Sequence, residues 1–153
     1  MKKLKSIKFY NFVIIAGHIT LNVNFFDEYG KLIVMDFSNY LSSTTTTKCE
    51  TDKYLITASS SYDTGNHNLL QAFHTANTNN TLNINRIGYT WVQYPTGQPS
   101  SDQFIKFEFK QPTVISNIHI IHSYDNSAGF DTCDIDITNY CGLFKFKFYK
   151  LVA

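Results

Sequence analysis

Acidic residues are the first candidates for chemistry in this chain of 153 residues, because a glycosidase needs two carboxyl groups flanking the scissile bond. Such a pair could be drawn from the aspartates of four separate segments: Asp63, Asp102, Asp125 and Asp131. Nothing in their spacing selects two of them. Asp134 and Asp136 alternate with apolar residues, which is typical of the polar face of a strand. The sequence therefore predicts no catalytic residues and a protein that is not an enzyme.

Histidines are the next candidates, because imidazole is a common metal ligand. His119 and His122 are three residues apart, and in a strand this spacing places them on opposite faces. We interpret them as hydrogen-bonded positions near the end of a sheet. His67 and His74 flank a short helical turn and could meet, but two histidines without a third ligand are weak evidence for a metal site. We expect no metal and no cofactor.

The three cysteines, Cys49, Cys133 and Cys141, show no CxxC spacing that would suggest zinc. Cys133 and Cys141 could pair across a hairpin in an oxidising compartment. The alternative, which we favour, is three free thiols that behave as small apolar side chains.

The charge composition argues against a nucleic-acid partner, because the net charge is only +1. Charged residues make up 16% of the chain, against about 25% in an average domain. Asn, Thr and Ser take their place. A neutral polar surface suits a virion or extracellular protein, and codon bias in an AT-rich genome explains it equally well. No apolar run approaches the roughly 18 residues that span a membrane, so we expect no membrane insertion.

The elements that must position these residues are almost all strands. Two β-rich runs at 7–15 and 18–26 are separated only by Ala16 and Gly17, which predicts a tight hairpin. Residues 68–73 form the one plausible helical turn, and 42–47 are either a loop or an edge strand. Further strands are expected at 31–37, 54–60, 103–109, 114–122, 133–137 and 143–151. The pattern predicts one all-β domain, a sandwich or barrel, over residues 1–153.

A series of short motifs narrows this prediction. In order, they are a Thr-Ala-Ser-Ser strand at 57–60, an Ala-Phe pair at 72–73, Trp91, an alternating strand at 104–109 and a strand after Pro112. Their order and spacing resemble the discoidin, or coagulation-factor C-type, family of galactose-binding-like domains. This resemblance implies a jelly-roll β-sandwich in which Ala72 and Phe73 plug the interior and Trp91 pins a loop. Residues 19–33 resemble the segment that usually closes such domains. Their position ahead of the other motifs resembles the order in phage tail and receptor-binding proteins.

One position departs from the family. Many relatives follow the Ala-Phe pair with an aspartate and further oxygen ligands that hold a structural calcium. This chain has His74 there, followed by Thr75 and Ala76. Calcium needs several carboxylate or carbonyl oxygens, and none is concentrated here. We therefore expect no calcium.

The resemblance also implies that ligands meet the loops at one end of the sandwich. These loops include residues 62–67, 91–98 and 123–126. Aromatic rings in them can stack on sugars, and polar groups can bond hydroxyls. The candidate ligand-binding residues are Tyr62, Asp63, Asn66, His67, Trp91, Tyr94, Tyr124, Asp125 and Asn126. The alternative places Trp91 in the core and uses the tyrosines only to cap the sandwich.

Together these features predict a non-catalytic virion structural or attachment protein: a phage tail, fibre or capsid-decorating module with a carbohydrate-binding fold. Its expected partners are other virion proteins, further copies of itself and a surface glycan, and its expected location is the virion. The alternative is a free-standing, secreted lectin-like module. A glycan-cleaving enzyme is the third hypothesis, and it needs carboxylates that the sequence does not select.

Overall fold

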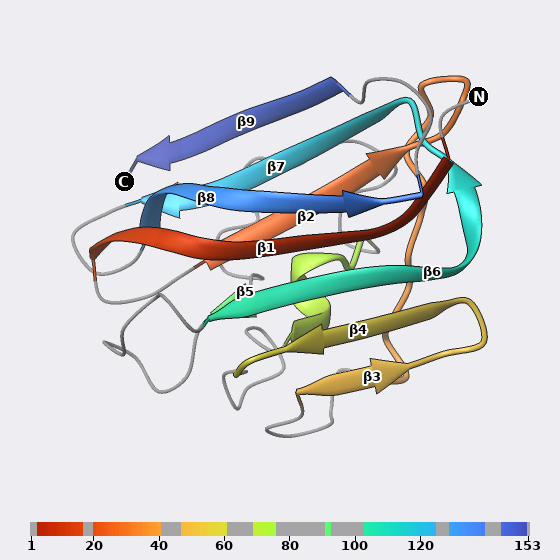
Figure 1. Cartoon of the computed structure of the whole chain (residues 1–153), viewed down its shortest axis with the longest axis horizontal. Coiled ribbons are helices and arrows are strands. Elements are labelled where there is room, and N and C mark those ends of the chain that lie inside the picture. Colours follow the sequence, from red (N-terminus) through yellow and green to blue (C-terminus); the bar gives the residue numbers. More distant parts are fainter. Residues whose placement is uncertain are drawn as a thin grey trace.

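The computed structural model describes residues 3–16, 20–40, 47–60, 69–75, 91–92, 103–124, 129–139 and 145–152 (Figure 1). Its strands are β1 (Lys3–Ala16), β2 (Thr20–Phe26), β3 (Lys48–Glu50), β4 (Tyr54–Ala58), β5 (Trp91–Val92), β6 (Phe104–Val114), β7 (Asn117–Tyr124), β8 (Gly129–Thr138) and β9 (Lys145–Val152). One 3-10 helix, η1, covers Leu69–Ala72. Within these ranges no helix is long and apolar enough to cross a membrane.

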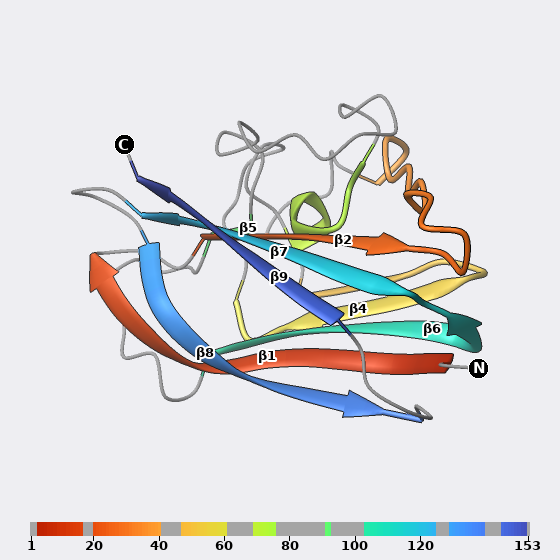
Figure 2. The ribbon, with the colours of Figure 1, turned by 90° about the horizontal axis from the view of Figure 1, so that it is seen from above.

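The strands form two layers that face each other (Figure 2). One layer has the order β3-β4-β6-β1-β8 and is antiparallel throughout. The other contains β5, β2 and β7, with β9 parallel to β7 at its far side. The layers are connected where β7 meets β8, through the pair Tyr124 and Gly129. The prediction of an all-β sandwich is confirmed, whereas its galactose-binding-like jelly-roll topology stays a prediction.

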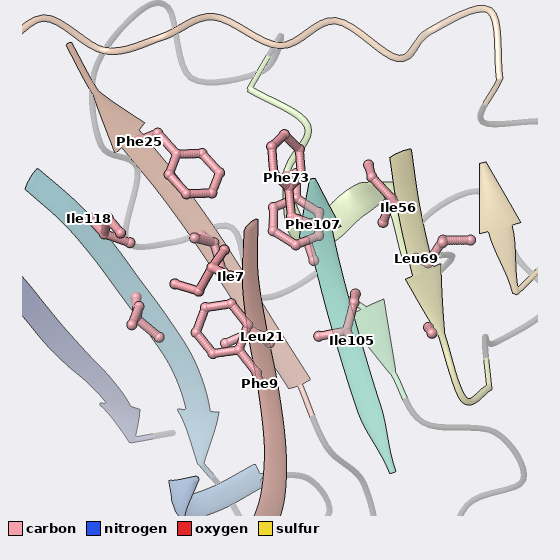
Figure 3. Close-up of a cluster of buried hydrophobic side chains, with 14 of the residues drawn as sticks. Ile7, Phe9, Leu21, Phe25, Ile56, Leu69, Phe73, Ile105, Phe107 and Ile118 are labelled. Atoms are coloured by element: carbon pink, nitrogen blue, oxygen red, sulfur yellow. The ribbon is translucent and has the colours of Figure 1, made fainter. Parts of the chain in front are cut away.

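The core follows from the two-residue period of the strands. In β6, Ile105, Phe107 and Phe109 are buried, while Lys106 and Glu108 lie on the outer face, as the alternation predicts. Figure 3 shows the inward side chains of both layers meeting in one cluster. Since η1 adds Leu69, Leu70 and Ala72, followed by Phe73, to this cluster, the predicted plug is present.

A β-bulge in β1 changes which residues face the core. Asn11 has a positive φ of 48°, and the pairing with β8 shifts register between Tyr10 and Val13. As a result Phe9 and Phe12 are both buried although they are three residues apart. Asn11 tolerates this backbone better than most residues, and its side-chain amide donates to Asp134 Oδ2 at 2.9 Å.

The predicted hairpin between residues 7–15 and 18–26 is wrong. β1 pairs with β6 and β8, whereas β2 pairs with β5 and β7, so the two strands lie in different layers. Each strand has one apolar face, and these faces pack against each other across the sandwich. The short break at Ala16 therefore connects the two layers instead of turning within one.

The predicted strand at residues 31–37 is also wrong. Leu32, Met35 and Phe37 are buried, while Val34 and Asp36 are exposed. Its only ladder pairing within the described residues is a single bridge between Leu32 and Phe26. The backbone of the segment is held near its start by β2, where the Ile33 N–H donates to the Phe25 carbonyl at 2.8 Å, and further along by groups that follow η1.

Candidate functional site

Most of the predicted loop-end site lies outside the described residues. This holds for Tyr62, Asp63, Asn66, His67, Tyr94, Asp125 and Asn126. For Trp91, which pairs with Leu21, and for Tyr124 the structure describes the backbone alone. Whether Trp91 belongs to the core or to a binding site therefore stays open.

The described strand ends next to these loops do lie together. Ala58 at the end of β4 pairs with Ile105 at the start of β6, and the neighbouring Phe104 pairs with Tyr10 of β1. β1 continues to Ala16, which pairs with Gly129 beside the end of β7. Figure 1 shows the ends of β4 and β7 and the start of β6 on one side of the molecule. This arrangement is compatible with the implied loop cluster.

At the opposite end of the sandwich, the described side chains form a groove. One pocket of about 320 Å³ lies between residues 34–37, Tyr40 and residues 51–54. A second pocket of about 260 Å³ continues along Ile33 and the end of β6. Both pockets are lined by Asp52, Lys53 and Tyr54. We call the two pockets together the Tyr54 groove.

The turn between β3 and β4 forms one side of the groove. Thr51 Oγ1 accepts hydrogen bonds from the N–H groups of Lys53 (3.2 Å) and Tyr54 (3.0 Å). The Thr51 N–H donates to the Tyr54 carbonyl at 2.9 Å, and the Lys110 N–H donates to the Lys53 carbonyl at 2.9 Å. These bonds fix the turn, so that Asp52 and Lys53 are exposed at its tip.

Residues 34–40 form the other wall. Val34 and Tyr40 are 51% and 39% exposed. Between them, Met35 and Phe37 are buried and anchor the wall in the core. The carboxylate of Asp36 accepts hydrogen bonds from both the N–H and the hydroxyl of Ser38. The wall thus presents an aromatic ring and a fixed carboxylate to the groove.

Two buried side chains after η1 hold this wall in place. The Phe37 N–H donates to His74 Nδ1 at 3.0 Å. The Met35 N–H donates to Thr75 Oγ1 at 2.6 Å, and the Thr75 N–H donates to the Met35 carbonyl at 2.9 Å. His74, at the position where the discoidin resemblance implies an aspartate, therefore has a structural role here.

Two side chains that line the groove have shifted pKa values. Burial, and then the charge of Asp52, raise the pKa of the Tyr54 phenol, so it stays neutral. The hydrogen bonds from Ser38 lower the pKa of Asp36, so it is a carboxylate at neutral pH. A glycosidase acid needs the opposite shift, toward a higher pKa. The groove therefore offers a phenol, an aromatic face and carboxylate acceptors.

The aspartates and histidines that the sequence offered as candidates for chemistry make structural contacts. Asp134 and Asp136 are exposed on β8, as predicted, and Asp136 Oδ1 accepts a 3.2 Å bond from the Tyr10 hydroxyl. Buried His122 lies with Nδ1 2.8 Å from the Phe130 carbonyl, and half-buried His119 packs on Phe26. Their different burial agrees with opposite faces. Among the described residues, no three His, Cys, Asp or Glu side chains gather as a metal site.

The described residues include only some of the glycosidase candidates and only two of the three cysteines. Asp63, Asp102 and Asp125 lie outside the described residues, as does Cys141, and only the backbone of Asp131 is described. Cys133 and Cys49 carry free thiols. The disulfide between Cys133 and Cys141 is therefore not formed in this structure.

No family model, no curated protein and no solved structure matches the chain. The discoidin resemblance consequently stays a prediction, and the function has to be argued from the site.

Sequence reasoning missed the Tyr54 groove because residues 31–37 were assigned to a strand and the turn at residues 51–53 was not predicted. One local signal was present in the sequence. A threonine hydroxyl can close a turn by accepting the backbone N–H two residues later, as Thr51 does with Lys53. The opposite wall had no such signal, because its anchors at His74 and Thr75 are 37 and 40 residues away along the chain.

Proposed function

We propose that this chain is a non-catalytic attachment module that binds carbohydrate in the Tyr54 groove. The observation that carries the proposal is the arrangement of the groove itself. The exposed ring of Tyr40 and the carboxylates of Asp36 and Asp52 line one pocket, and the turn residues Asp52 to Tyr54 extend it into the next.

This chemistry fits a sugar. A pyranose ring has an apolar face that stacks on an aromatic side chain, and its hydroxyls donate to carboxylates and bond with phenols and ammonium groups. The two pockets, of about 320 and 260 Å³, lie near the lower end of the usual range for small-ligand sites. Because they adjoin along the turn, a short saccharide fits them better than a single sugar.

The virion setting is the second part of the proposal, and the sequence alone supports it. The order of the family-like segments and the low charge content favour a tail, fibre or capsid-decorating module that assembles with other virion proteins or with itself. A free-standing lectin-like module would use the same groove and differ only in its setting. Size-exclusion chromatography with light scattering separates the two: a discrete multimer supports the virion role, and a monomer that never joins particles contradicts it.

Mutations in the groove test the carbohydrate proposal. Tyr40→Ala and Asp52→Asn should each weaken binding of a glycan identified on an array by about tenfold or more, which corresponds to about 1.4 kcal/mol. The dissociation constant is measured by calorimetry. The matched control is Tyr29→Ala, because Tyr29 is 85% exposed and lies outside the groove; its affinity should equal that of the wild type.

The same experiment tests the predicted loop-end residues as the alternative binding site. Tyr62→Ala, Tyr94→Ala and Tyr124→Ala should leave binding in the groove unchanged. Loss of binding in these variants, with wild-type affinity in Tyr40→Ala and Asp52→Asn, would place the sugar at the predicted loops instead. Folded protein that binds no glycan on the array would remove the carbohydrate proposal altogether.

A further inference from the structure

The wall of the Tyr54 groove is attached to the core by one bond that depends on protonation. His74 is 3% exposed, and its Nδ1 accepts the Phe37 N–H at 3.0 Å. Phe37 itself is 1% exposed. An imidazole nitrogen accepts a hydrogen bond only while it carries no proton, since imidazolium is a donor at both nitrogens. Protonation at Nδ1 would turn this bond into two opposed N–H groups in a buried place.

The neighbouring attachment has no such dependence. Met35 is held by the Thr75 hydroxyl and by the Thr75 backbone, and neither group titrates in the physiological range. The two anchors are adjacent in sequence, but they hold different parts of the wall. Relief of the two opposed N–H groups requires the Phe37 backbone to move away from His74, and this movement would carry the residues after Phe37, including Tyr40, while Met35 stays fixed by Thr75.

Several described groups contribute to the electrostatic surroundings of His74. The wall contributes Asp36, whose charge interacts with His74 and favours the protonated imidazole. It also contributes the Phe37 ring, 6.3 Å away between ring centroids. The preceding helix η1 contains no acidic or basic residue. β4 contributes Tyr54, which contacts the Phe37 ring at 5.9 Å. Burial and the Phe37 N–H favour neutral His74, and Asp36 opposes them.

We propose that His74 is an acid-sensitive latch of the Tyr54 groove. At neutral pH it accepts the Phe37 N–H and holds Tyr40 against the groove. As the pH falls toward 5, His74 takes up a proton, the segment after Phe37 separates from the core, and a bound saccharide is released. The release step rests on the proposed carbohydrate function, whereas the opening of the wall does not.

Hydrogen exchange of single backbone amides, followed by NMR, tests the latch without any ligand. After correction for intrinsic exchange, the protection of the Phe37 amide should fall at least tenfold between pH 7.5 and pH 5.0. The Met35 amide, which donates to Thr75 Oγ1, should keep its protection. Equal protection of Phe37 at both pH values overturns the proposal, and so does a parallel loss at Met35.

The matched variant is His74→Asn. An asparagine Oδ1 can accept the bond in place of Nδ1 and does not titrate, so the Phe37 amide should keep its protection at pH 5.0. A loss as large as in the wild type overturns the assignment to His74. If this variant does not fold, the NMR resonances of the His74 ring in the wild-type protein test the assignment to His74 instead. They should titrate together with the exchange of Phe37, and a ring that stays neutral at pH 5.0 overturns the latch.

Binding measurements at both pH values separate the two proposals. With a saccharide found on the array, the affinity of the wild type should fall at least tenfold from pH 7.5 to 5.0, and that of His74→Asn should not. Affinity that is independent of pH, in a protein that binds sugar, contradicts the latch alone. Absence of any sugar binding, with the pH-dependent exchange of Phe37 intact, contradicts the carbohydrate function alone.

Discussion

Replacing Phe107 by alanine is expected to lower the free energy of unfolding by about 3–5 kcal/mol. Phe107 is completely buried, and its ring lies 4.8 Å from Phe73, 4.9 Å from Phe109, 5.0 Å from Phe25 and 5.3 Å from Tyr54, between centroids. These partners come from both layers and from the segment after η1, as Figure 3 shows for Phe25 and Phe73. Truncation would leave a cavity where the two sheets meet. Urea unfolding followed by circular dichroism measures the loss.

Phe104→Ala is the matched control, because Phe104 belongs to the same strand but points to the opposite face. It is half-buried on the outer surface, where Lys8 Nζ lies 5.0 Å from its ring centroid. We expect this variant to cost about 1 kcal/mol or less. Equal losses for Phe104→Ala and Phe107→Ala would contradict the assignment of the inner face of β6.

Cys133 should react on the order of 10²-fold more slowly with a disulfide reagent at pH 8 than an ordinary cysteine, because its much smaller fraction of thiolate outweighs the higher nucleophilicity of that thiolate. Burial, and then the charge of Asp134, raise the pKa of the Cys133 thiol to about 12. The folded-state pKa is raised, so the thiol is neutral below that value. At pH 8 about 10⁻⁴ of it is ionised, against about a quarter of a thiol with the usual pKa of about 8.5.

The measurement needs a protein in which Cys133 is the single cysteine, with Cys49→Ser and Cys141→Ser. Stopped-flow absorbance then compares the folded protein with the same protein in denaturant. In this background Asp134→Asn should speed the reaction only slightly, because burial is the larger cause. A native thiol that reacts as fast as the denatured one would show that the inner face of β8 is open.

The acid-sensitive bond at His74 also bears on stability. The bond exists only with neutral His74, so its contribution to folding is present at neutral pH and lost as the pH falls. Its loss acts on the wall, whereas the rings packed around Phe107 do not titrate in this pH range. We therefore expect local opening of the groove in acid before global unfolding.

Most of the long strands, and the faces that they bury, could be predicted from the sequence. Alternation in β6 placed Phe107 inside and Lys106 outside, and alternation in β8 placed Asp134 and Asp136 outside; both were confirmed. The helical turn before Phe73 was also predicted. These properties can be read from sequence because a strand repeats every two residues, so the pattern of apolar side chains records one buried face without any knowledge of its partner.

Which strands pair with one another could be learned only from the tertiary structure. Residues 7–15 and 18–26 look like a hairpin, yet β1 and β2 lie in opposite layers. β9 runs parallel to β7, a pairing that no turn between neighbours could suggest. β3 and β5 have only three and two residues, too few for an alternating pattern. An apolar face can be buried by any other apolar face of matching shape, so local pattern leaves the pairing open.

The Tyr54 groove in turn depends on how the strands and the segments between them pack. Tyr40, Asp52 and Tyr54 meet because the segment after β2 is held by His74 and Thr75 beside the β3–β4 turn. In the sequence, His74 stood out as a weak candidate metal ligand together with His67 and as the residue at the position where the discoidin resemblance implies an aspartate. Its actual role, accepting the Phe37 N–H, requires two segments 37 residues apart to be packed together. The apolar pattern of a strand is local and can be read from the sequence. A groove between three segments forms only when the two layers pack together.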